Sequence, residues 1–155
     1  MKQQYLERAI ELARTGMAQA GGGPFGAVVV RGDQIVAEGF NQVTGSLDPT
    51  AHAEVGAIRS ACQALATFSL QGCEIYSSCE PCPMCLSAIY WARLDRLYYA
   101  ATRTDAAEIG FDDAFLYTEL TLEPAQRRLP SVHALRESAR QVMLPWKQMP
   151  SDRRY

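Results

Sequence analysis

Apolar residues along this chain switch repeatedly between the spacing of an amphipathic helix and the unbroken runs that buried strands carry. In residues 2–20 the helical spacing is set by Leu6, Ala9, Ile10, Ala13 and Met17. Gly21 to Pro24 end this helix. The β-rich runs at residues 25–30 and 35–38 are separated by a turn, and they predict a β-hairpin.

The same alternation continues through the middle of the chain and weakens after residue 101. Thr50 is placed to cap a helix, and Pro81 stands where first-turn prolines stand. The elements predicted after the hairpin are a polar loop at 41–49, a helix at 51–66, a strand at 74–78, a helix at 82–92, a strand at 96–101, a loop at 102–113, a helix at 114–119, a strand at 131–135 and a helix at 137–143. Strands that alternate with helices favour an α/β fold. We therefore expect a three-layer α/β/α sandwich, with a mixed five-stranded sheet and helices on both faces.

The size and composition are those of one ordinary globular domain. The chain has 155 residues, of which 48% are hydrophobic and 21% are charged. A domain of this length buries enough surface to fold without a disulfide or a metal staple, so a bound metal is expected to serve a function. We expect a single domain over residues 1–155.

The net charge of −2 argues against a protein whose whole surface is built to grip nucleic acid or anionic lipid. Residues 121–155 nevertheless hold seven basic and three acidic side chains, which gives this end of the chain a net charge of +4. No apolar run approaches the roughly 18 residues of a membrane span, and the first residues lead into no signal-peptide core. The expected location is the cytoplasm.

Three of the five cysteines, Cys79, Cys82 and Cys85, recur at every third position. In a reducing compartment this spacing favours metal ligation over a disulfide framework. Cys82 and Cys85 share one face of the predicted helix, so their sulfurs can occupy two corners of a tetrahedron around zinc. The positive end of the helix dipole favours the thiolate form that a metal requires.

His52 is the predicted third ligand, because it too falls at the start of a predicted helix. The only other histidine is His133, so a three-histidine zinc site is excluded. Three protein ligands leave one corner of the tetrahedron for water. An imidazole and two thiolates cancel the charge of a divalent ion, so that water needs a nearby base. Glu54 can lean past the same helix end and serve as the general base and acid.

Other interpretations of the cysteines stay open. A Cys-x-x-Cys pair can be a redox pair of the thioredoxin kind, and three cysteines can hold an iron–sulfur cluster, although neither would use His52 and Glu54. Cys79 could close a structural zinc site as a fourth ligand, although a strand-end thiol is more often a buried core group. Cys62 and Cys73 are most simply core residues, and His133 is most simply structural.

Two segments, Thr50-Ala51-His52-Ala53-Glu54-Val55 and Cys79-Glu80-Pro81-Cys82-Pro83-Met84-Cys85, together resemble the zinc-dependent nucleobase deaminases, whose signature pairs His-x-Glu with Pro-Cys-x-x-Cys. Within this superfamily the chain is most similar to the bacterial guanine deaminases, and the similarity extends through nearly the whole chain. The resemblance implies a cytidine deaminase-like fold and one zinc per subunit. It also implies hydrolysis of guanine at C2 to xanthine and ammonia, in which Glu54 carries a proton to the leaving amino group.

The resemblance also implies a substrate pocket, in which Asn41 and Asp113 hydrogen-bond the purine while Phe25 and Trp91 pack on its ring. Guanine presents an N1–H and a 2-amino group that one carboxylate can accept together, which adenine and cytosine do not. Asp112 could exchange roles with Asp113, because either aspartate could cap the helix that follows. Phe25 and Trp91 could instead be core aromatics.

A homodimer is the implied assembly, with exchanged C-terminal segments at about residues 131–155, so that Tyr155 closes the partner's active site and excludes water. The alternative functions are a tRNA adenosine deaminase, which the basic C-terminal end keeps open, and a deaminase of guanosine or of another free base such as cytosine. A protein with a non-catalytic zinc site is the remaining class. Trp91 and residues 110–113 match the guanine deaminases instead of the tRNA enzymes.

Overall fold

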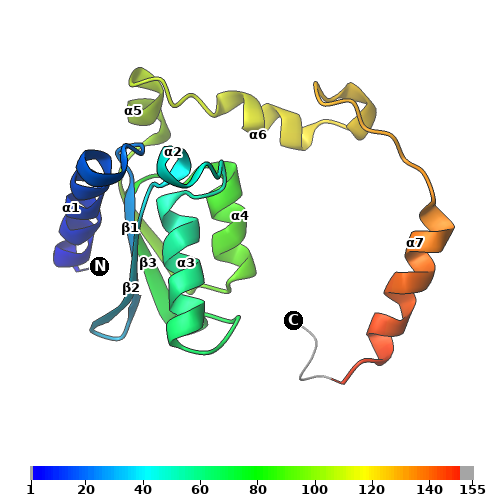
Figure 1. The fold of residues 1–155 in the computed structure, drawn as a ribbon, viewed down its shortest axis with the longest axis horizontal. Helices are drawn as coiled ribbons and strands as arrows, with labels where there is room; N and C mark the ends of the chain where they lie inside the picture. Colours follow the sequence, from blue (N-terminus) through cyan, green and yellow to red (C-terminus); the bar gives the residue numbers. More distant parts are fainter. Residues whose placement is uncertain (1, 151–155) are drawn as a thin grey trace. The chain divides into compact units, whose positions relative to one another are not determined.

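Four strands form one mixed sheet in the order β2-β1-β3-β4 (Figure 1). The computed structural model describes residues 2–150. The strands are β1 (Gly26–Arg31), β2 (Gln34–Phe40), β3 (Cys73–Cys79) and β4 (Arg96–Ala101). β1 is antiparallel to β2 and to β3, whereas β3 and β4 are parallel. The predicted hairpin and the mixed character of the sheet are therefore confirmed.

Helices cover both faces of this sheet. The chain divides into a first unit, residues 1–115, which contains the sheet, and a second unit, residues 116–155. The helices of the first unit are α1 (Gln3–Ala20), α2 (Val43–Ser46), α3 (Ala53–Ala64), α4 (Pro83–Trp91) and α5 (Arg103–Glu108). α1 lies on one side of the sheet, and α3 and α4 lie on the other (Figure 1). This arrangement confirms the predicted α/β fold.

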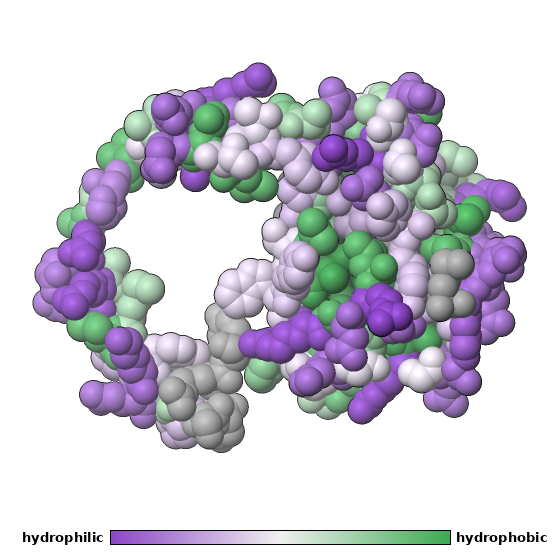
Figure 2. Space-filling model, turned by 180° about the vertical axis from the view of Figure 1, so that it is seen from behind, coloured by the Kyte–Doolittle hydropathy of each residue, from purple (hydrophilic) through white to green (hydrophobic). Residues whose placement is uncertain are grey.

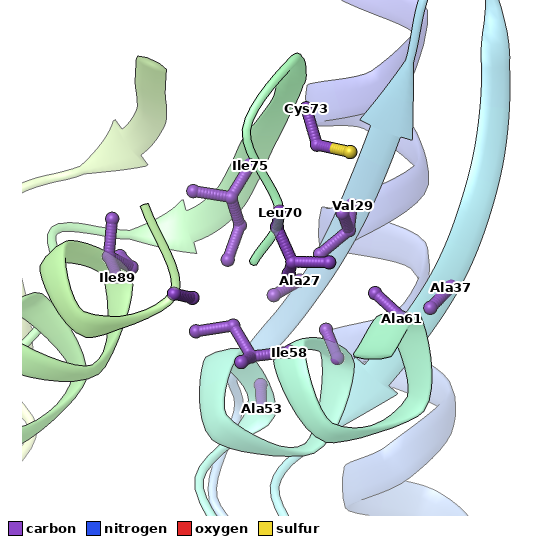
Figure 3. Close-up of a cluster of buried hydrophobic side chains, with 12 residues drawn as sticks. Ala27, Val29, Ala37, Ala53, Ile58, Ala61, Leu70, Cys73, Ile75 and Ile89 are labelled. Atoms are coloured by element: carbon purple, nitrogen blue, oxygen red, sulfur yellow. The ribbon is translucent and has the colours of Figure 1, made fainter. Parts of the chain in front are cut away.

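Alternate side chains of the strands supply the two layers of the core. Towards α1, the buried cluster consists of Tyr5, Leu12, Val28, Val30 and Tyr76. Ala27 and Val29 point the other way and belong to a larger cluster that includes Ile58 of α3 and Ile89 of α4 (Figure 3). Because both of its faces are covered, β1 is a continuous apolar run from Ala27 to Val30 rather than an alternating one.

Two strand glycines let helices approach the sheet closely. A Cβ atom on Gly26 would lie 2.2 Å from the carbonyl oxygen of Ala9 in α1. A Cβ atom on Gly39 would lie 2.3 Å from the carbonyl oxygen of Ala53, the first residue of α3. Both distances are far inside van der Waals contact, so only glycine permits this packing. Gly39 thus fixes how close the start of α3 comes to β2.

The helix at α3 begins two residues later than the sequence predicts. Its first residue is Ala53, and its N-cap residue is His52 rather than Thr50. The reason is that Thr50 serves a local turn: its backbone N–H and its hydroxyl both donate to Asp48 Oδ1, each at 2.7 Å. That turn leaves the Thr50 hydroxyl unable to cap the helix.

A similar shift occurs at α4, which begins at Pro83 with Cys82 as its N-cap residue. Pro83 therefore takes the first-turn position that the sequence assigns to Pro81. Proline fits this position because its missing N–H would have no partner within the helix.

The polar stretch expected to be a loop at residues 102–113 contains α5. Thr102 and Asp105 form a capping box, in which each side chain accepts a hydrogen bond from the other residue's backbone N–H. The Thr-x-x-Asp spacing was the signal in the sequence that could have predicted this helix. The loop expected at residues 41–49 likewise contains the short helix α2.

The second unit is helical in its described part. It holds most of α6 (Ala114–Thr121), then η1 (Pro124–Gln126), α7 (Arg136–Met143) and η2 (Leu144–Gln148), which confirms the helices predicted at 114–119 and 137–143. The strand predicted at residues 131–135 is wrong. This stretch joins no ladder in residues 2–150, and Val132 is 93% exposed. β-branched residues favour a strand only where a neighbouring strand receives them. The sheet of the described chain has four strands, not five.

Within residues 2–150, no helix combines the length and the apolarity that crossing a membrane requires.

Substitution of Gly39 tests the close approach of α3 to the sheet. We expect Gly39→Ala to lower the free energy of unfolding by about 1–3 kcal/mol, because the added methyl must displace the backbone of α3. Gly56→Ala is the matched control, since a Cβ there meets nothing within 4 Å and alanine favours the helix. Urea denaturation measures both, and equal stability of the two variants would contradict the packing argument.

Candidate metal centre

His52 and Cys82 occupy equivalent positions, each as the N-cap residue of a helix. Both have extended backbone angles, and neither side chain makes a capping hydrogen bond. α3 and α4 pack against each other. Their N-cap side chains are therefore free to project past the helix ends toward one point, and Cys85, in the first turn of α4, faces the same point.

The three predicted ligands come together. The ligand atoms of His52, Cys82 and Cys85 all lie within 4.8 Å of one another. His52 Nδ1 lies 3.6 Å from Cys82 Sγ and 3.4 Å from Cys85 Sγ. Zn–N and Zn–S bonds of their usual lengths at a tetrahedral angle would separate nitrogen and sulfur by about 3.6 Å. The observed spacing therefore fits a zinc ion.

Hydrogen bonding alone does not account for this arrangement. A ring nitrogen carries either one hydrogen or one lone pair in the plane of the ring, so Nδ1 can form one good hydrogen bond. Two sulfurs nevertheless approach Nδ1 of His52. A cation that all three atoms share satisfies each of them, and this donor set of one imidazole and two thiolates is one that zinc favours.

Cys79 stands apart from this group. The metal-binding group found among the described residues has three members and does not include Cys79. The Cys79 thiol instead donates to the carbonyl oxygen of Thr102 at 3.5 Å, and burial raises its pKa to about 11. Because the Cys79 thiol is directed at this carbonyl and lies outside the group of three, the geometry favours an open site with three protein ligands over a closed site with four.

The two sulfurs affect each other's pKa in opposite directions. The neighbouring Cys85, together with His52, lowers the pKa of Cys82 to about 4. The neighbouring Cys82, together with burial, raises the pKa of Cys85. The Cys82 thiolate in turn raises the pKa of His52 by accepting a hydrogen bond from it. The group is therefore already anionic at Cys82, which prepares it for a cation.

Glu54 lies beside the sulfur atoms, in the first turn of α3, and is only 6% exposed. Its Oε2 accepts from Cys85 Sγ at 3.4 Å, and its Oε1 accepts from the hydroxyl of Ser77 at 3.4 Å. Burial raises the pKa of the Glu54 carboxyl. A carboxyl group whose pKa moves toward neutrality can both accept and return a proton, as acid–base catalysis requires.

Asn41 is buried, and its side chain connects two loops. Its Oδ1 accepts from the backbone N–H of Gly23 at 3.1 Å and from that of Val43 at 3.2 Å. Because Oδ1 takes both of these hydrogens, the orientation of the carboxamide is fixed. Its Nδ2 is then the atom that can donate to a further acceptor.

The two neighbouring aspartates have different surroundings. Asp112 Oδ1 accepts from the backbone N–H of Ala114 at 2.9 Å, and so it caps the start of α6. The pKa of Asp113 is raised by burial and, next, by the negative charge of Cys82. Asp113 thus lies within electrostatic reach of the metal-binding group, whereas Asp112 has a structural partner.

The two aromatic residues predicted to pack on the substrate, Phe25 and Trp91, also have different surroundings. Phe25 packs edge-to-face against Phe111, with ring centroids 4.9 Å apart, in the loop region that also holds Asp113. Trp91 is the last residue of α4 and is 67% exposed. It lies about 9 Å along the helix axis from Cys85, so the chain does not bring it to its own metal-binding group. Tyr155 lies outside the described residues.

Phe111 and Ser77 contact the predicted site residues Phe25 and Glu54, but the sequence analysis assigned them no role. Phe111 belongs to a segment that the resemblance includes, so its aromatic character was a signal that could have been used. Ser77 gave no signal, because a serine in a strand belongs to no sequence motif that indicates a catalytic role. Only the structure shows that its hydroxyl meets Glu54.

Comparison with known proteins agrees with this geometry. Residues 1–101 match the cytidine and deoxycytidylate deaminase zinc-binding region. The chain is 56% identical over 126 residues to a guanine deaminase of Bacillus subtilis, which covers 81% of each protein. It is 38% identical over 100 residues to a tRNA-specific adenosine deaminase of Aquifex aeolicus, covering 64% of this chain and 66% of that protein.

Solved structures give the same relationship. The guanine deaminase of Bacillus subtilis superposes with a TM-score of 0.95 at 47% identity, covering 100% of this chain and 99% of that one. The guanine deaminase of Nitrosomonas europaea superposes with a TM-score of 0.69 at 35% identity, covering 73% and 65%. The chain therefore belongs to the cytidine and deoxycytidylate deaminase zinc-binding family.

Proposed function

We propose that this chain is a zinc-dependent guanine deaminase, which hydrolyses guanine to xanthine and ammonia. The observation that carries the proposal is the open group of His52, Cys82 and Cys85 with the buried carboxyl of Glu54 beside it. The 56% identity to a guanine deaminase supports the choice of substrate within the family.

His52, Cys82 and Cys85 would hold one zinc ion per subunit. When bound, zinc supplies a Lewis acid that makes a water molecule a competent nucleophile near neutral pH. One imidazole and two thiolates leave the centre with no net charge, so this water is less acidic than at an all-histidine site. Proton transfer by a protein group is therefore a necessary part of the reaction.

Glu54 would perform that transfer. It would take one proton from the attacking water and pass it to N3 of guanine, as the oxygen bonds to C2 and the C2=N3 double bond opens. It would then take the second proton from the resulting hydroxyl and pass it to the 2-amino group, which leaves as ammonia while the C2=O bond of xanthine forms. Its burial and raised pKa suit both steps, because the group must be a base at the start and an acid at the end. Exclusion of bulk water would keep the proton on this path.

Asn41, Asp113 and Phe25 would form the substrate contacts. The Asp113 carboxylate can accept from the N1–H and the 2-amino group of guanine, and Nδ2 of Asn41 can donate to a purine acceptor. Phe25 would pack on the ring, with Phe111 behind it. These groups recognise the base and do not by themselves distinguish guanine from guanosine.

The second unit would complete the enzyme as part of a homodimer. All its helices in the described range lack buried residues. Hydrophobic residues are visible on the surface of the molecule in Figure 2. Among the exposed apolar residues of the second unit are Leu129, Val132, Leu135, Val142 and Met143. A segment with this many exposed apolar side chains needs a surface to cover. Exchange of residues 131–155 between two subunits would supply one and would bring Tyr155 to the partner's site. In this dimer Trp91 would be a further substrate contact.

Deamination of adenosine in tRNA is the second candidate, because relatives with that name match at 38% and 46% identity. The net charge of +4 at the C-terminal end also suits a phosphate backbone. Guanine remains favoured by the higher identity over a larger share of the chain. We place the enzyme in the cytoplasm.

A substrate panel tests the proposed function. We expect zinc-loaded protein to release ammonia from guanine at least about 100-fold faster than from adenine, cytosine or tRNA, since only guanine pairs with the carboxylate. Guanosine in the same panel decides between base and nucleoside. Release from tRNA that falls steeply with added salt, with none from guanine, would establish the second candidate instead.

Zinc content tests the ligand set. We expect Cys82→Ser to lose most bound zinc, because it removes one of three ligands. Cys79→Ser is the matched control and should keep one zinc per chain, since Cys79 donates to Thr102 instead. Both contents are measured by elemental analysis of the purified protein. Loss of zinc from the Cys79 variant would show a closed site with four protein ligands.

Glu54→Gln tests proton transfer. We expect zinc content to stay at one per chain while kcat for guanine falls about 10²- to 10⁴-fold, because the amide cannot carry the proton. Glu108→Gln, an exposed glutamate of α5, is the control and should retain full activity. Steady-state ammonia release gives both values. Substantial turnover by a zinc-loaded Glu54 variant would remove Glu54 from the mechanism.

A further inference from the structure

Ser77 is a buried polar residue on a face of the sheet that is otherwise packed by apolar side chains. It lies in β3, 1% exposed, two residues after Ile75. Alternate residues of a strand share a face, and Ile75 belongs to the cluster that packs against α3 and α4. The Ser77 side chain therefore faces the helices that carry the metal-binding group, whereas its neighbour Ser78 faces the other side and accepts from the backbone N–H of Gly26 at 3.0 Å.

The hydroxyl of Ser77 is directed at Glu54. It donates to Glu54 Oε1 at 3.4 Å, and both residues are buried. A hydroxyl in such surroundings must have a partner, because burial without one costs about 1–3 kcal/mol. An alanine would fill the same place in the core without that requirement. The presence of a hydroxyl therefore indicates that Ser77 acts on the Glu54 carboxyl group through this hydrogen bond.

The hydrogen bond from Ser77 would matter more to the Glu54 carboxylate when a metal ion is bound. The other oxygen of Glu54, Oε2, accepts from the thiol of Cys85 at 3.4 Å. As a thiolate ligand, Cys85 has no hydrogen to donate, so this bond is lost. Apart from the backbone N–H of Glu54 itself, Ser77 is then the donor that still holds the carboxylate within the described residues.

We propose that Ser77 is a positioning residue, whose hydroxyl fixes the orientation of the Glu54 carboxylate for proton transfer in the metal-loaded centre. The inference deepens the proposed deamination and rests on it for the reaction, but not for the geometry. Ser77 touches neither a predicted ligand nor the substrate contacts by any hydrogen bond found in residues 2–150.

A pair of variants with matched shape isolates the hydroxyl. Ser77→Thr and Ser77→Val add similar volume, and only threonine keeps the O–H. We expect kcat for guanine to be about 10- to 100-fold lower in the valine variant than in the threonine variant. We also expect KM to agree within about twofold between them, because substrate binding uses other residues. Ser78→Ala is the control on the same strand and should lower stability while leaving kcat near the wild-type value.

Zinc-loaded crystal structures of the two variants give a second measurement that does not need turnover. In the valine variant the Glu54 carboxylate should be rotated or disordered, and in the threonine variant it should keep its contact with the hydroxyl. If wild-type protein released no ammonia from guanine, the proposed function would fail, and these structures would still decide the role of Ser77. Equal kcat and an unchanged Glu54 in both variants would overturn the inference. Should both variants fail to fold, Ser77→Ala decides, and wild-type kcat in that variant overturns it.

Discussion

The centre depends on two helices that begin at the same place. α3 and α4 each place an extended residue, His52 or Cys82, just outside the first turn, where a side chain can reach past the end of its helix. The sheet sets the separation of these ends, because Gly39 lets the first residue of α3 approach β2 and because α4 follows directly from β3. A displacement of either helix would separate Nδ1 from the sulfurs by more than one metal ion can bridge.

The same arrangement explains how anionic ligands are tolerated in a buried place. Unpaired N–H groups at a helix N-terminus carry partial positive charge, and two such ends converge on the thiolate of Cys82. The neighbouring Cys85 and His52 lower the pKa of Cys82, so the negative charge is favoured on that sulfur, and the pKa of Cys85 is raised. A divalent cation at this point would neutralise two thiolate ligands, and its binding would release any proton that they still carry.

Spacing in the sequence predicted the chemistry better than it predicted the local structure. The ligands His52, Cys82 and Cys85 follow from a short pattern of residue types, whereas the starts of their helices depend on whether Thr50 caps a helix or serves a turn. The strand at residues 96–101 was predicted correctly from its run of apolar residues. The strand predicted at residues 131–135 does not form, because residues with strand propensity form a strand only where a neighbouring strand can pair with them. Ser77 could not be found at all, since its meaning lies in a contact with a residue 23 positions away.

The residues proposed to contact substrate lie in loops whose backbone is held by side-chain hydrogen bonds. One atom of Asn41 holds the N–H of Gly23, before β1, and the N–H of Val43, at the start of α2, so two loops far apart in sequence keep one geometry. Asp112 likewise accepts from the backbone N–H of Ala114 at the start of α6, and the pKa of the adjacent Asp113 is raised by burial and by the charge of Cys82. A carboxylate fixed before the substrate arrives loses little entropy on binding and needs little rearrangement. Selection of a purine by the proposed substrate contacts would then follow in part from hydrogen-bonding groups that the fold places before the ligand binds.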